Sequence, residues 1–274
     1  MRPIEQLWPD RSGPALDLPG ELELLYGGPL GLGAPLLYAN FVASLDGVVA
    51  IRSQPRSNRL ISGSSEADRF VMGLLRACAD AVVVGSGTLN ASPRSLWTAE
   101  QAFPAAAEAF AELRRRLGLR PLPVVAVLTG SGSVDPTHPA LGPDALVLTT
   151  AHGAERLERH GPFPAEVVAL GEGASADAAR AVELLRGRGH ARILSEAGPH
   201  VFGALVHAGL VDELFLTLSP VLAGRSGQTL RLGLVEGREL LPRRGAQARL
   251  VDVRRHGAHL FLRYGFRARP SDDP

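Results

Sequence analysis

The sequence predicts a wound α/β fold, in which a mixed, mostly parallel sheet carries helices on both faces and an antiparallel hairpin at its C-terminal edge. Short apolar strand segments alternate with amphipathic helical segments between residues 36 and 208. Segments such as AVVVG (81–85) and VVAVL (124–128) have no polar face, as expected for strands covered on both sides. Beyond Val211, strand-like segments follow one another with no helix between them.

The elements follow from these periodicities in chain order. Parallel strands are predicted over residues 36–44, 81–85, 124–128, 145–149, 167–170 and 193–195. Helices are predicted over 66–79, 99–117, 151–159, 176–188 and 199–208. The first has Ser64 or Ser65 as its N-cap, and the last begins at Pro199 and ends at Gly209. Strands over 212–219, 248–255 and 259–266 complete the sheet, the last two forming a hairpin at His256-Gly257-Ala258.

The two ends of the chain lack these long periodic segments. Residues 1–34 are rich in Pro, Gly and acidic residues and predict an N-terminal extension on the surface, with a short helix around 22–26. Residues 268–274 predict a polar tail. A single domain therefore spans residues 35–267.

Composition excludes several classes of function. The 274 residues are 45% hydrophobic and 21% charged, and the net charge of +1 gives no electrostatic reason to expect a nucleic-acid or membrane partner. The basic charge is entirely arginine, so no lysine can serve as a Schiff base or general base. The single cysteine excludes an internal disulfide, and the eight histidines lack metal-ligand spacing, so no metal is predicted. We expect a soluble cytoplasmic protein, since no segment has the length of a membrane span.

The most informative segment is RILSEAGPHVFGAL (192–205). A strand ends at Ser195-Glu196, a turn follows at Gly198-Pro199, and a helix begins at once. This geometry leaves backbone N–H groups free at the helix N-terminus, which suits a pyrophosphate. The Glu196 carboxylate precedes the turn, where a polar substrate group could reach it. His200 falls in the first turn of this helix, where cofactor contact and simple solvent exposure are equally compatible with the sequence.

Other segments are ambiguous when taken alone. NFVASLDG (40–47) places polar groups at the carboxyl end of the first parallel strand, although Asp46-Gly47 could simply form a turn. In AVVVGSGTL (81–89), the small residues after the strand either contact a cofactor or only satisfy the conformation of a loop. Arg76 is either a helix-flank arginine or a bidentate ligand of a substrate phosphate.

Three blocks in this order resemble the reductase domain of riboflavin-biosynthesis enzymes. They are NFVASLDG (40–47), LLRACADAVVVGSGTL (74–89) and ILSEAGPHVFGALVHAGLVDELFLTLSPVL (193–222). They are similar to the RibD C-terminal family, often called pyrimidine reductases, which shares the dihydrofolate reductase fold. The resemblance covers about residues 34–266. The zinc deaminase half of bifunctional members is missing, because the chain has no HxE and no PCxxC motif.

The resemblance implies an NADPH-dependent reductase and a role for each matching residue. Asp46 and Glu196 would be catalytic, and Asn40, Arg76 and Glu196 would bind a small phosphorylated substrate. The cofactor would contact Gly85, Gly87, Thr88, Gly198, Pro199, His200, Val201, Phe202 and Gly203. Hydride would pass to C1 of the ribosylamino group of a pyrimidine, and the enzyme would be a homodimer.

The chain also departs from the family pattern at positions that bear on the substrate. Asn40 replaces a frequent lysine, Ser92 lies near a usual acidic position, and Gly130-Ser131 occupies a place where relatives can present an arginine to the 2′-phosphate. The leading substrate is 5-amino-6-(5-phosphoribosylamino)uracil. A dihydrofolate-like or secondary-metabolite reductase is the second hypothesis, and a non-catalytic nucleotide-binding homologue is the third.

Overall fold

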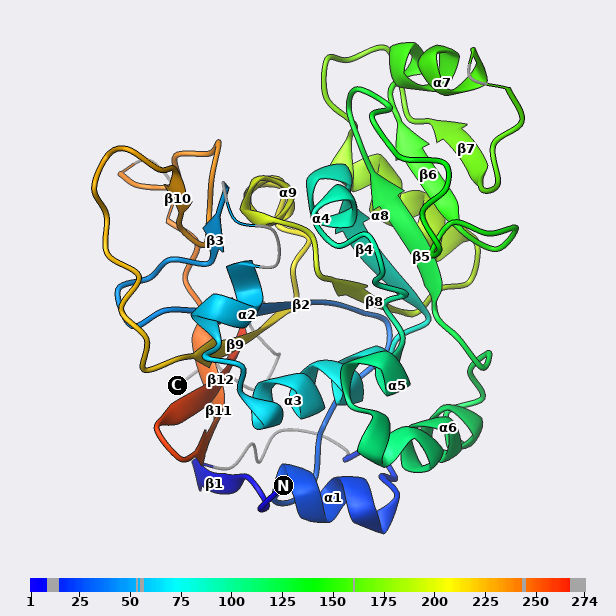
Figure 1. Cartoon of the computed structure of the whole chain (residues 1–274). Coiled ribbons are helices and arrows are strands. Elements are labelled where there is room, and N and C mark those ends of the chain that lie inside the picture. Colours follow the sequence, from blue (N-terminus) through cyan, green and yellow to red (C-terminus); the bar gives the residue numbers. More distant parts are fainter. Residues whose placement is uncertain (9–14, 53, 55–56, 160, 243–244, 267–274) are drawn as a thin grey trace.

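The computed structural model describes residues 1–8, 15–52, 54, 57–159, 161–242 and 245–266. Ten strands of this part of the chain form one sheet with helices on both faces (Figure 1). In spatial order they are β1 (Glu5–Trp8), β11 (Arg249–His256), β12 (His259–Gly265), β9 (Glu213–Leu218), β2 (Leu36–Ala43), β8 (Arg192–Ser195), β4 (Ala81–Gly85), β5 (Val124–Leu128), β6 (Leu146–Thr149) and β7 (Glu166–Ala169). Neighbours from β9 to β7 are parallel, whereas β12, β11 and β1 pair antiparallel. The predicted wound sheet and its C-terminal hairpin are confirmed.

Side chains of each strand alternate between two cores, one on each face of the sheet. In β4, Val82 and Val84 belong to one core, while Ala81 and Val83 belong to the other. The first core is covered by α1 (Gly20–Tyr26), α3 (Glu66–Ala77), α6 (Ala107–Arg116) and α7 (Ala151–Glu158). The second is covered by α8 (Ala178–Gly187) and α9 (Pro199–His207). Burial on both faces explains why these strands lack a polar side.

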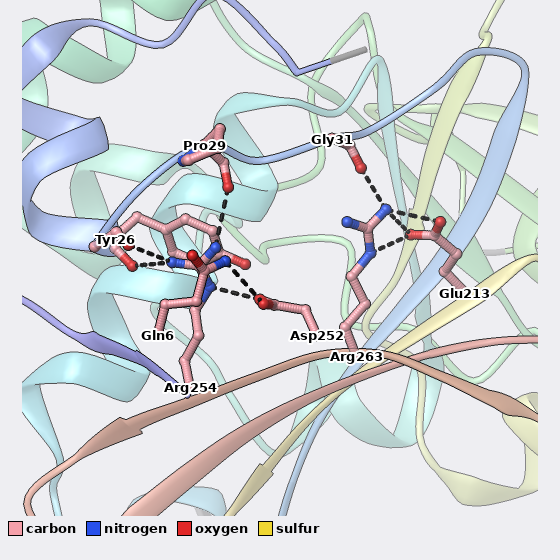
Figure 2. Close-up of polar contacts among 9 residues, drawn as sticks. Gln6, Tyr26, Pro29, Gly31, Glu213, Asp252, Arg254 and Arg263 are labelled. Atoms are coloured by element: carbon pink, nitrogen blue, oxygen red, sulfur yellow. Dashed lines mark hydrogen bonds and ion pairs between the residues drawn. The ribbon is translucent and has the colours of Figure 1, made fainter. Parts of the chain in front are cut away.

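The N-terminal segment is more deeply integrated than the sequence predicts. The short helix is confirmed as α1, but β1 extends the sheet by pairing with β11, and Ile4 and Leu22 lie in the first core. Arg254 of β11 donates hydrogen bonds to the backbone carbonyls of Tyr26, Gly27 and Pro29 (Figure 2). The expected surface extension is therefore corrected for the described residues, because its apolar side chains complete the core. The predicted tail, 268–274, lies outside the residues described.

The helix predicted over 99–117 is divided into three pieces. α5 (Ala99–Ala102), a 3₁₀ turn (Pro104–Ala106) and α6 replace it. Pro104 has no N–H to donate and disfavours the helical conformation of the preceding residue, and Phe103 indeed has φ −143° and ψ 85°. The predicted N-cap of α3 is confirmed, since the Ser65 hydroxyl accepts a hydrogen bond from the Asp68 N–H.

Several short elements are not predicted by the periodicities. They are the helices α2 (Ser57–Ile61) and α4 (Ser86–Asn90), and a separate two-stranded pair of β3 (Ala50–Ile51) and β10 (Arg231–Leu232). Each is too short to show a period of its own. None of the helices described has the length and apolar character needed to cross a membrane.

Candidate active site

The carboxyl ends of β2, β8 and β9 bring polar residues to one region of the sheet edge. Ala39 of β2 pairs with Ser195 of β8, and Val42 pairs with Thr217 of β9. Glu196 follows Ser195 directly, so it lies beside Asn40 in the register. Because side chains alternate along a strand, Asn40 shares the face of Tyr38, which is the face covered by α3.

Arg76 of α3 and Glu196 form a buried bidentate ion pair. Nε of Arg76 donates to Oε1 of Glu196 at 2.9 Å, and Nη2 donates to Oε2 at 2.6 Å. Nη1 donates to the Thr98 carbonyl at 3.3 Å, and the Arg76 side chain is only 6% exposed. The structure thus gives the fork of the Arg76 guanidinium to Glu196 rather than to the predicted substrate phosphate. The pair leaves two of the carboxylate's four lone-pair positions for another donor.

Asp68, in the first turn of α3, is a second carboxyl group in this region, and the sequence prediction does not include it among the site residues. Its side chain is hydrogen-bonded to Thr217 and is half-buried. Burial raises the pKa of Asp68 to about 6, and the charge of Glu196 raises it further, against the lowering effects of Thr217, His259 and Arg69. No sequence motif marks this residue, because its environment comes from β9, β12 and the end of β8.

The N-terminus of α9 has the geometry of an anion site. Gly198 is its N-cap and Pro199 its first residue, and among the residues described the N–H groups of Gly198 and His200 have no hydrogen-bond partner. A Cβ atom added at Gly198 would lie 3.7 Å from Oγ1 of Thr88, so the α4 hydroxyl borders the same space. Gly85 approaches α9 closely as well, since an added Cβ would lie 3.7 Å from Cγ2 of Val201. These residues fit a pyrophosphate.

Two residues predicted to line this pyrophosphate site instead pack inside the protein. Phe202 is buried in the second core, with its ring 4.9 Å from that of Phe41. A Cβ atom added at Gly203 would lie 2.7 Å from the Glu236 carbonyl oxygen. Both side-chain positions face protein rather than the open end of the helix, so a contact of either residue with the pyrophosphate stays a prediction. His200 is exposed, which agrees with either of the interpretations that its sequence position allowed.

Asp46 lies in a turn, which is one of the two interpretations that the sequence allowed for it, the other being a catalytic role. Its Oδ1 accepts hydrogen bonds from the Ser44 hydroxyl and the Ala223 N–H, and its Oδ2 accepts one from the Gly224 N–H. These bonds lower the pKa of Asp46 to about 2. The carboxylate is exposed and joins two loops, so the geometry favours the turn over a proton-transfer role.

The remaining predicted positions are less constrained. Asn40 lines a small cavity of about 10 Å³ together with Thr217 and Phe215. An added Cβ at Gly87 would meet nothing within 4 Å, so this glycine leaves open space beside α4.

A larger hollow of about 340 Å³ lies away from Glu196, between the loop 132–138 and α7, and none of the predicted site residues lines it. The described residues contain no group of three or more potential metal ligands.

Comparison with known proteins adds the family context. The family described as the RibD C-terminal domain matches residues 35–260. A 2,5-diamino-6-ribosylamino-4(3H)-pyrimidinone 5′-phosphate reductase of Archaeoglobus fulgidus is 29% identical over 199 residues, which are 72% of this chain and 85% of the relative.

Solved structures show the same fold. A pyrimidine reductase-like protein from Corynebacterium diphtheriae superposes with a TM-score of 0.68 and 22% identity, covering 86% of this chain and 93% of that one. RibD from Acinetobacter baumannii gives a TM-score of 0.61 and 20% identity, with 90% of this chain and 60% of that chain covered. The reductase Rib7 of Saccharomyces cerevisiae gives 0.56 and 14%, with coverage of 88% and 94%.

Proposed function

Because the chain belongs to the RibD C-terminal domain family, we propose that it is an NADPH-dependent pyrimidine reductase of riboflavin biosynthesis. The substrate is a phosphorylated ribosylaminopyrimidine, with 5-amino-6-(5-phosphoribosylamino)uracil as the leading candidate. The Archaeoglobus relative favours the corresponding 2,5-diaminopyrimidinone as the other member of this class. Both share the ribosylamino carbon that accepts hydride.

The observation that carries the proposal is the position of two different binding groups at the carboxyl edge of one sheet. The N-terminus of α9 offers unpaired N–H groups beside Thr88, while Glu196 is anchored at the end of the adjoining strand. Ligands of wound α/β sheets bind at this edge. A cofactor phosphate and a polar heterocycle can therefore be held next to one another.

The residues fit a dinucleotide. The N–H groups of Gly198 and His200 would bind its pyrophosphate with the help of the helix dipole, and Thr88 would contribute a hydroxyl. When bound, the nicotinamide supplies the hydride. We propose NADPH rather than NADH on the family resemblance alone. Gly130 and Ser131 do not provide a guanidinium that could bind the 2′-phosphate.

The protein's own contribution is orientation and charge. Arg76 fixes both oxygens of Glu196 through a bidentate ion pair. Glu196 then accepts hydrogen bonds from N–H groups of the pyrimidine, which sets the distance and angle of the ribosylamino carbon to the hydride donor. A fixed carboxylate cannot rotate away from this geometry, because the arginine pair holds it in two places.

The substrate phosphate needs another cation, because Arg76 is committed to Glu196. Arg69 of α3 is exposed and its charge acts on Asp68, so we propose it as the cation for the phosphate. Replacement of Arg76 is accordingly expected to impair phosphorylated and dephosphorylated substrates alike. The homodimer implied by the resemblance and the cytoplasmic location expected from the sequence remain part of this proposal.

The test begins with cofactor binding, followed as energy transfer from tryptophan to NADPH or NADH. Trp97 is buried, so it is a better-defined donor than the exposed Trp8. Saturable binding of NADPH, with NADH much weaker, is expected. Turnover is then measured with both pyrimidines and with dihydrofolate. Reduction of dihydrofolate alone would replace the proposed substrate, and failure to bind either nucleotide would remove the α9 site from the proposal.

A further inference from the structure

We infer that Asp68 is the group that gives a proton to the substrate nitrogen during the reduction. This inference rests on the proposed function and adds a catalytic residue to it. Neither the family motifs quoted above nor the predicted site includes Asp68, which is found only when the strands around α3 are in place.

The position of Asp68 suits a proton donor. It lies in the first turn of α3, where the Ser65 cap holds its backbone N–H at 3.3 Å. Its side chain is hydrogen-bonded to Thr217 and is close enough to Glu196 to feel that charge. The residue is half-buried, so it is shielded by protein but still reachable from outside. Asp68 and Glu196 therefore border the same face of the sheet edge.

The two carboxyl groups differ in their partners. Glu196 has a bidentate arginine, whereas Asp68 is faced by a hydroxyl from β9, by His259 of β12, by the Glu196 carboxylate and by its neighbour Arg69. Desolvation and the nearby negative charge favour its neutral form, and its pKa of about 6 leaves about a tenth of the molecules protonated at pH 7. A carboxyl group kept neutral by its surroundings, beside a second carboxylate held by an arginine, is a common general acid.

The proton balance of the step is simple. The imine carbon of the opened ribosylamino group receives the hydride, and the C=N π electrons move to the nitrogen. The nitrogen forms its N–H bond with the proton of the Asp68 carboxyl group, whose O–H bond breaks. Asp68 is left as a carboxylate beside Thr217 and regains a proton from water before the next turnover.

The protonation state can be measured without turnover, by ¹³C NMR of protein labelled at the aspartate carboxyl carbons. We expect one aspartate to titrate near pH 6 in the ligand-free protein, and this signal to be absent from Asp68→Asn. The matched control is Asp177→Asn, which removes the exposed N-cap carboxylate of α8 on the other face of the sheet. It is expected to leave the signal unchanged. If every aspartate titrates below about pH 4.5, the inference is overturned.

The catalytic role is measured by the pH dependence of kcat/KM. A required acid of this pKa predicts a tenfold fall per pH unit above about pH 6, because only the protonated form reacts. Asp68→Asn is expected to lower kcat/KM on the order of 10²–10³-fold and to remove this alkaline limb, with NADPH affinity unchanged. If the wild type is active and Asp68→Asn is equally active, the donor role is wrong and the proposed function stands. If the wild type reduces no pyrimidine, both the proposed function and the donor role are wrong.

Discussion

Two clusters of buried arginines and carboxylates in this protein differ in how completely their charges are matched. The hairpin cluster consists of Arg254 with Asp252 and Arg263 with Glu213, and its arginines also bond backbone carbonyls of residues 26–31 (Figure 2). The edge cluster consists of Arg76, Glu196 and Asp68. Each cluster contains a bidentate arginine pair, but only the edge cluster has one more carboxyl group than arginine.

This difference separates a structural role from a chemical one. In the hairpin cluster each carboxylate has its own arginine, and Asp252 also accepts from the Gln6 side chain. Such a network joins the N-terminal segment to the hairpin. In the edge cluster the surplus carboxyl of Asp68 carries the raised pKa. Charge balance, rather than the presence of buried ion pairs, therefore distinguishes the candidate active site.

The largest expected effect comes from breaking the hairpin cluster with Arg254→Met. Removal of the guanidinium leaves Asp252 buried without its cation and the carbonyls of Tyr26, Gly27 and Pro29 without a donor. We expect the free energy of unfolding to fall by about 3–5 kcal/mol, as measured by chemical denaturation. The matched control is Arg255→Met on the same strand, whose ion pair with Glu5 is exposed and should contribute less than about 1 kcal/mol. Equal losses in the two variants would contradict a structural role specific to the hairpin cluster.

A sharper comparison replaces the bidentate carboxylate of each cluster by its amide. Glu196→Gln is expected to lower kcat/KM about 100-fold or more, because the substrate loses a charged acceptor, while NADPH affinity changes less than about twofold. Glu213→Gln makes the same change opposite Arg263 and should reduce stability, with kcat/KM of the folded enzyme unchanged. Steady-state kinetics and thermal unfolding are measured on both variants. Matching activity losses would show that the two pairs do not differ in function.

The smallest expected effect is on the free energy of unfolding, through Asp68, the carboxyl group that has no arginine of its own in the edge cluster. The folded-state pKa of Asp68, about 6, lies above the usual 3.8, so its favourable contribution is complete below about pH 4 and is lost as pH rises through 6. Asp68→Asn removes a carboxylate that is unfavourable above this range. We expect the variant to be more stable than wild type by about 1–3 kcal/mol at pH 8, with the difference disappearing toward pH 4. A pH-independent difference between the two denaturation curves would show that Asp68 is not perturbed.

The sequence by itself determined the strands and helices that carry long periods, the Ser65 cap, the C-terminal hairpin and the turn at Gly198 that begins α9. These features follow from local chemistry: apolar periodicity, hydroxyl caps, and the conformations open to glycine and proline. The family resemblance likewise followed from residues that are close in sequence. A helix interrupted at Pro104 could have been predicted on the same basis, because the restriction on Phe103 is local.

Only the tertiary structure decided what the charged side chains do. Arg76 and Glu196 are 120 positions apart, and their pairing depends on α3 crossing the end of β8. The burial of Phe202 and the close packing at Gly203 depend on contacts with Phe41 and the loop at Glu236. The pKa of Asp68 depends on Glu196, Thr217 and His259, which come from three other segments. The physical reason is that desolvation and Coulomb interactions depend on distances in space, whereas the sequence pattern contains only distances along the chain.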